Sequence, residues 1–189
     1  IRLSLVGSEM CIRDSFHIGQ FAETAWQWCL YDDDPETWAE YFPLFREAAE
    51  YFALNLVEED ENGSLRIRSC TDYDEAIFPV TNGLYTGCAA IRCFEIAANL
   101  AERLGRASRR RVVWTEYAKR LRGNLPRTPD GYRYQSFPGA SHHHIAELGP
   151  VFPFRIDPGT ECARNTVEAF SEACRSDLGW SAGSLPDYV

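Results

Sequence analysis

The stretch NGLYTGCAAIRCFEIAANLAERLG, residues 82–105, decides the fold. Polar side chains that interrupt its apolar and small residues lie at five positions: Arg92, Glu95, Asn99, Glu102 and Arg103. A helix with this distribution packs against neighbours on more than one side. Gly105 follows the last apolar position and ends the pattern. The sequence therefore predicts a buried helix over residues 82–104.

Four more helices are predicted on either side of it, over residues 19–31, 35–57, 108–123 and 160–174. Asp34 followed by Pro35 is a strong helix start, because an aspartate accepts a hydrogen bond from the first turn and proline fits the first helical position. Short strands are expected at residues 64–70, which alternate, and at 132–134. The rest of residues 126–158 is expected to be loop.

The helices differ in how widely they are apolar. We expect the helices at 19–31 and 82–104 to be buried on several sides, and those at 35–57 and 108–123 to be one-sided. Short turns at Asp32 and Gly105 join neighbouring helices into antiparallel hairpins. An inner ring of helices inside an outer ring gives this alternation, whereas a solenoid would show a fixed repeat, which is absent. The predicted class is all-α, with short β segments in loops.

Residues 1–15 are expected to be foreign to the protein. Residues 5–15, LVGSEMCIRDS, resemble the translation of a transposon-type sequencing adapter, and Met10 in this run is the chain's only methionine. We therefore expect residues 1–15 to be an artefact and 16–189 to be an internal piece of a catalytic domain. The alternative is a genuine N-terminal arm.

The composition excludes several classes of function. A chain with 45% hydrophobic and 13% aromatic residues can form a sizeable core. Its net charge of −9 argues against nucleic acid or an anionic membrane as a partner, since both need a basic surface. No apolar run approaches the roughly 18 residues of a membrane span. The sequence does not set an oligomeric state.

Metal and cofactor sites are not expected. Six cysteines lie in residues 16–189, none in a Cys-x-x-Cys pair, and we interpret them as buried thiols, which favours a reducing, cytoplasmic location. The triplet at residues 142–144, three histidines, lacks the ligand spacing of a metal site, because adjacent side chains point in different directions. Zinc is therefore not predicted.

Several segments carry a resemblance to one superfamily. They are TAWQW at 24–28, FPLFREAAEYF at 42–52, the acidic turn EEDENG at 58–63, and residues 148–170. In addition, Asp74-Glu75 followed by NGLYT at 82–86 matches the spacing of Gly-Pro-Asp-Glu-Tyr-His…Asn-Asn-Ala-Tyr-Thr, although the proline and the Tyr-His are absent here. Together these segments resemble the six-hairpin glycosidases, which include glucoamylases and maltose phosphorylases. The resemblance implies a partial (α/α)6 toroid of antiparallel helix hairpins.

The resemblance also implies a glycoside hydrolase, most simply an inverting one, acting on a carbohydrate. It implies that Glu75 is the general acid and that the second carboxylate lies on later helices, beyond Val189, so residues 16–189 alone are not expected to form a working enzyme. Independently, Asp72, Asp74 and Glu75 form an acidic cluster, and crowded carboxylates raise one another's proton affinity, as an acid catalyst needs. The alternative is a solvated acidic loop that caps the helix at 82–104.

Candidate sugar-binding residues follow from residue type and position. Asp72 and Asp74 flank the expected acid, and Trp26, Trp28, Tyr73 and Tyr85 offer flat rings for sugar faces, with core packing as the alternative. His17 and Gln20 lie near the start of the first helix, the end that faces the sugar in this superfamily. Three other functions stay open: a phosphorylase of the same fold, a sugar epimerase whose histidines shuttle protons, and a non-catalytic helical interaction protein.

Overall fold

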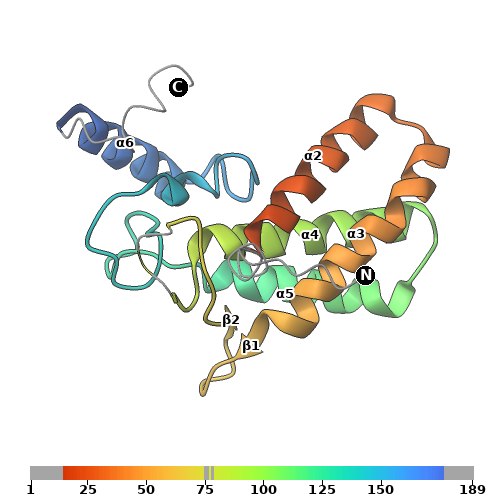
Figure 1. Ribbon diagram of the computed structural model, residues 1–189, viewed down its shortest axis with the longest axis horizontal. Coiled ribbons are helices and arrows are strands. Elements are labelled where there is room, and N and C mark those ends of the chain that lie inside the picture. Colours follow the sequence, from red (N-terminus) through yellow and green to blue (C-terminus); the bar gives the residue numbers. More distant parts are fainter. Residues whose placement is uncertain (1–14, 75–76, 78, 177–189) are drawn as a thin grey trace, which may run out of the picture.

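The computed structural model describes residues 15–74, 77 and 79–176, and these residues are mostly helical (Figure 1). The elements in chain order are α2 (Phe16–Asp32), α3 (Pro35–Asn55), β1 (Val57–Glu59), β2 (Leu65–Ile67), α4 (Leu84–Arg103), α5 (Ser108–Gly123), the 3-10 helix η1 (Ile145–Leu148) and α6 (Glu161–Ser176). Glu75 falls outside the described residues, as do residues 1–14. The predicted all-α class is confirmed.

Helices α2 and α3 form an antiparallel hairpin. The Trp38 indole near the start of α3 donates to the Cys29 carbonyl near the end of α2, over 3.1 Å. Further along, the Trp26 and Phe45 rings meet edge to face. The start of α3 is as predicted: Pro35 is its first residue, and the carboxylate of the preceding Asp34 accepts a hydrogen bond from the Glu36 amide.

Helices α4 and α5 form the second hairpin, and it lies beside the first (Figure 1). Contacts between α2 and α4 advance in the same direction along both helices: Gly19 meets Ala89, and Glu23 pairs with Arg92. The two first helices of the hairpins are therefore parallel. On the other side, Glu50 of α3 binds Arg110 and the Trp114 indole of α5.

The core is centred on α4. Fourteen residues of this helix are buried, as the opening stretch of sequence predicted. Cys29, Cys70, Cys88 and Cys93 are buried as expected, whereas Cys162 and Cys174 are only partly buried. No described helix has the length and apolar character needed to cross a membrane.

The expectation that the first helix is buried on several sides is wrong for the described residues. Phe21, Trp28 and Tyr31 on α2 are 62%, 53% and 85% exposed. The helix carries apolar residues on several sides, but α3 and α4 cover only one side of it, and no other described element covers the opposite side.

The β structure also differs from the prediction. Helix α3 ends at Asn55, before the predicted end at residue 57, because Val57 begins β1. In this pair of strands Val57 pairs with Ile67 and Glu59 with Leu65. Residues 132–134 form only one isolated bridge, between Arg127 and Tyr134, instead of a strand. Alternation predicted β2, but nothing in the local pattern of residues 57–59 indicated its partner.

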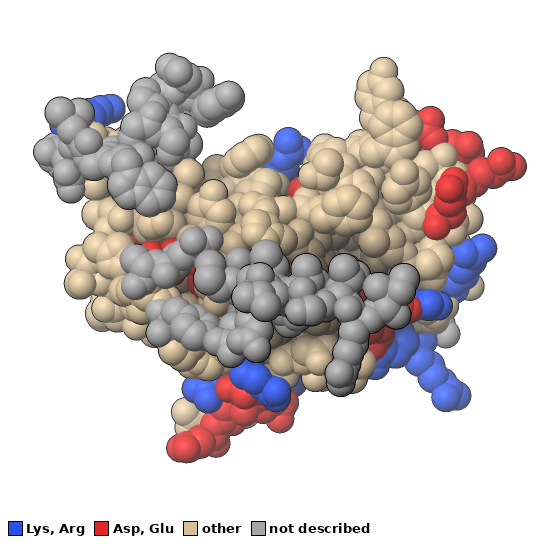
Figure 2. Space-filling view, viewed as in Figure 1, with Lys and Arg blue, Asp and Glu red and all other residues tan. Residues whose placement is uncertain are grey.

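Charged side chains of both signs mingle on the visible face (Figure 2). Acidic and basic groups gather together near the β1–β2 hairpin, acidic groups gather near the tip of the α2–α3 hairpin, and the described central part is largely uncharged. Ion pairs such as Arg120 with Glu59 join the two signs at the β hairpin.

Candidate functional site

The N-terminal ends of α2 and α4 lie side by side, and polar and aromatic residues gather there. The ring centroid of Phe16, the first residue of α2, is 5.6 Å from that of Tyr85 in the first turn of α4. One turn further on, a Cβ at Gly19 would lie 2.3 Å from the Ala89 Cβ, so only glycine permits this approach. The parallel packing therefore brings two helix starts to one end of the molecule.

Asp72 anchors the start of α4. Its carboxylate accepts from the Thr86 amide (2.8 Å), the Thr86 hydroxyl (2.7 Å) and the Tyr85 amide (3.2 Å). The side chain is fully buried; burial raises its pKa and these hydrogen bonds lower it, with a net upward direction. A Cβ at Gly83 would lie 2.6 Å from the carboxyl group, which explains the glycine there. Because no oxygen of Asp72 is exposed, we give it a structural role as the cap of α4.

Tyr73 lies on a small aromatic cluster. Its ring stacks on Tyr85 with centroids 4.6 Å apart and an angle of 21° between the planes. Phe16 and His144 contact Tyr73 edge-on at 5.4 and 5.9 Å. Burial raises the pKa of Tyr85 to about 12, so its hydroxyl stays protonated at neutral pH.

His17 and Gln20 extend this cluster along α2. The Gln20 amide nitrogen donates to the Tyr85 hydroxyl over 2.9 Å, and its carbonyl oxygen is 2.9 Å from His17 Nδ1. His17 is exposed. The two residues that the sequence placed at the start of the first helix therefore meet Tyr73's aromatic cluster through Tyr85.

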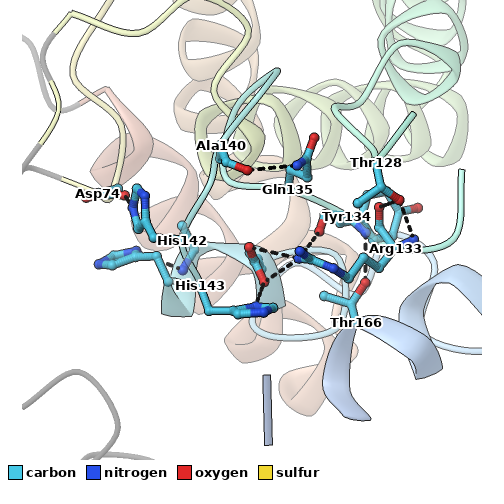
Figure 3. Close-up of polar contacts among 12 residues, drawn as sticks. Asp74, Thr128, Arg133, Tyr134, Gln135, Ala140, His142, His143 and Thr166 are labelled. Atoms are coloured by element: carbon cyan, nitrogen blue, oxygen red, sulfur yellow. Dashed lines mark hydrogen bonds and ion pairs between the residues drawn. The ribbon is translucent and has the colours of Figure 1, made fainter. Parts of the chain in front are cut away.

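Asp74 pairs with His142, 68 positions further along the chain (Figure 3). The Asp74 carboxylate contacts His142 Nε2, and the two side chains are 3% and 39% exposed. The carboxylate thus lies inside the protein while part of the imidazole faces solvent.

Glu147 forms the second carboxylate–imidazole contact of this loop (Figure 3). Its fully buried carboxylate lies 3.0 Å from His143 Nδ1 and 3.3 Å from the Arg133 guanidinium. Burial raises the pKa of Glu147, and His143 and Arg133 partly offset that effect.

His144 is held as a neutral ring. Its Nδ1 accepts from the Ala146 amide over 3.2 Å, which leaves the proton on Nε2. Burial lowers the pKa of His144, and this also favours the neutral form. The three consecutive histidines thus have three different partners, and no cluster of metal-ligating side chains suited to an ion occurs among the described residues.

An open hollow of about 520 Å³ is lined by Asp60, Arg66, Asn124, Phe137 and Pro138 and by described residues between 77 and 82. Phe137 lines the hollow, and its ring centroid is 6.0 Å from that of His142. Ile77, another lining residue, donates its amide to the Asp74 carbonyl over 3.5 Å. The Asp74–His142 pair therefore adjoins space that is large enough for a small ligand.

The structure brings together most of the residues that the sequence predicted for the site: Tyr73, Asp74, His17 and Gln20. Trp26 lies elsewhere. It is 6% exposed, packs on Phe45 and stands ten residues beyond Phe16, about 15 Å along α2 at the rise of a helix. We therefore treat Trp26 as a core residue. The position of Glu75 lies outside the described residues.

Sequence reasoning missed Glu147 and Arg133 as members of the site. A local signal existed, since Glu147 follows His143 by four positions, a spacing that lets two side chains meet on one helical turn. Nothing local indicated that Arg133, far from any predicted acidic residue, would reach the same carboxylate.

Comparison with known proteins adds no family to this picture: no protein-family model matches the chain, and no curated protein matches it.

Proposed function

We propose that this chain is part of a catalytic module that cleaves glycosidic bonds by hydrolysis, with the sugar bound at the shared N-terminal end of α2 and α4. The observation that carries the proposal is the gathering of Tyr73, Asp74 and His142 at this end, next to an open hollow. Asp74 is followed directly in the chain by Glu75, the acid that the resemblance implies.

The side chains at this end suit a carbohydrate. Sugars present apolar C–H faces to aromatic rings and hydroxyl groups to hydrogen-bonding side chains, and Tyr73, His17 and Gln20 offer both kinds of group. Glycoside cleavage also needs a carboxylic acid that protonates the departing oxygen. We assign that role to Glu75.

The arrangement of helices supports a toroid. An (α/α) toroid repeats one antiparallel hairpin, and the first helices of neighbouring hairpins run parallel. Here α2 runs parallel to α4 in this way. We infer that these are two consecutive hairpins of the six, with α2 and α4 in the inner ring. The exposed side of α2 is then the side on which a further inner helix would pack.

Replacing Glu75 by glutamine tests the proposal. The full-length protein is incubated with a panel of nitrophenyl glycosides and disaccharides, and released sugar and sugar binding are both measured. Because Glu75→Gln keeps the shape of the side chain and removes the proton donor, we expect turnover to fall at least 100-fold with binding retained.

Glu116→Gln, an exposed carboxylate on α5, is the matched control and should leave turnover unchanged. Unchanged turnover in Glu75→Gln removes Glu75 from the mechanism. A full-length wild-type protein that neither binds nor cleaves any glycoside in the panel rejects the proposed function.

A further inference from the structure

We propose that His142, held by Asp74, is the general base of this site. The inference rests on the proposed glycoside hydrolysis and supplies the proton acceptor that the reaction needs from residues already close to the hollow, instead of from a second carboxylate elsewhere.

The contact between the two side chains fixes the ring. An ionised carboxylate only accepts hydrogen bonds, so the Asp74 contact places the proton of a neutral His142 on Nε2. The lone pair then lies on Nδ1, which makes no hydrogen bond within the described residues. A ring that is 39% exposed and holds a lone pair on Nδ1 can take a proton from a bound water.

Asp74 also suits the charge that develops. When the ring takes up a proton it becomes a cation, and the adjoining carboxylate, which is 3% exposed, stabilises that cation without itself meeting the substrate. Asp74 is therefore a positioning residue, and His142 is the residue that we expect to contact the reacting water.

His143 is a weaker candidate for the same role. Its partner Glu147 is already shared with the Arg133 guanidinium, so that carboxylate has less negative charge available for a second cation. His144 is excluded because its Nδ1 lone pair accepts from a backbone amide. Within the described residues, the titratable groups that interact with His142 are Asp74 and His144.

The proposed step balances as follows. His142 Nδ1 takes one proton from water as the water oxygen bonds to the anomeric carbon, and the bond from that carbon to the departing oxygen breaks. The departing oxygen takes a proton from the acid of the proposed function. The imidazolium then returns its proton to solvent and the acid is reprotonated from solvent, so the net reaction is glycoside plus water to sugar plus alcohol.

His142→Gln is the decisive variant, because its amide nitrogen can still donate to Asp74 but cannot accept a proton. We expect kcat/KM to fall by 100-fold or more while sugar binding is retained. The wild type should lose activity at acidic pH, because its base must be unprotonated, and this loss should be absent from the pH profile of the variant. Added imidazole should partly restore turnover in His142→Gly, and Asp74→Asn should shift the acidic limb.

Glu116→Gln again serves as the control. The inference is overturned if His142→Gln turns over as well as wild type, or if it loses activity while the acidic limb of its profile persists, since a purely structural role would do the latter. If only the assignment of His142 is wrong, Glu75→Gln still abolishes turnover. If the proposed function is wrong, the wild-type protein is itself inactive, and the assignment of His142 falls with it.

Discussion

Asp72 illustrates how a residue chosen from sequence for one role can perform another. An acidic residue before a buried helix fits both a catalytic cluster and a helix cap. In the structure its two oxygens accept three hydrogen bonds from the first turn of α4. The sequence offered a cap from this acidic loop as the alternative, but it did not single out Asp72 among the carboxylates or show that the cap is buried.

Asp72→Ala should therefore destabilise the protein strongly. Three donors lose their acceptor, two of them backbone amides at a buried helix start, so we expect a loss of about 3 kcal/mol in the free energy of unfolding, measured by urea denaturation. Asp34→Ala, which removes the exposed cap of α3, should cost only about 1 kcal/mol. Equal costs for the two variants would contradict the special importance of Asp72.

Glu147 gives a prediction on pH. Its pKa is raised by burial from an ordinary value of 4.5, so the folded protein binds this proton more tightly than the unfolded chain. The contribution of Glu147 to stability is therefore fully present below pH 4.5 and is lost as pH rises through its higher folded value.

Glu147→Gln has no charge to titrate at this position. The difference in unfolding free energy between wild type and Glu147→Gln, measured by urea denaturation from pH 4 upward, should move against the wild type as pH rises. A difference that moves in favour of the wild type would mean that Arg133 and His143 outweigh burial.

At the scale of elements, the close approach of α2 to α4 rests on Gly19. Helical periodicity predicted both helices and the end of α5 at Gly123, whereas the N-cap of α5 is Ala107 and not Ser108. It could not predict which helix faces which, since that depends on contacts between residues some 70 positions apart. Gly19 in sequence is only a weak point in a helix; in the structure it is the place where Ala89 fits.

Gly19→Ala should separate the two helix starts. The added methyl group would lie 2.3 Å from the Ala89 Cβ, so we expect a cost of about 1–3 kcal/mol in unfolding free energy together with weaker sugar binding. Gly123→Ala, at the end of α5 with open space around it, should be neutral. The Gly19→Ala cost should shrink when Ala89→Gly is added, and an undiminished cost in the double variant would argue against this contact.

At the scale of the whole molecule, the pattern of apolar residues predicted the helices and their hairpins, but it did not predict the position of the loop that completes the site. Residues 126–158 have little periodicity, and their position depends on single long-range contacts such as His142 with Asp74 and Arg133 with Glu147. The histidine triplet was visible in sequence as unusual. Its partners became evident only when the chain was folded, because neither carboxylate is marked by a motif that includes a histidine.

The central claim is that the shared N-terminal end of α2 and α4 binds a carbohydrate. The most direct test is to record residue-resolved NMR spectra of the chain while methyl glycosides and disaccharides are added. We predict that signals of Tyr73, His142 and Gln20 shift in a saturable way with at least one sugar, while those of Trp114 do not. Shifts confined to residues away from this end and from the hollow, such as Trp28 and Tyr31 near the end of α2, or no saturable shift with any sugar, would contradict the account.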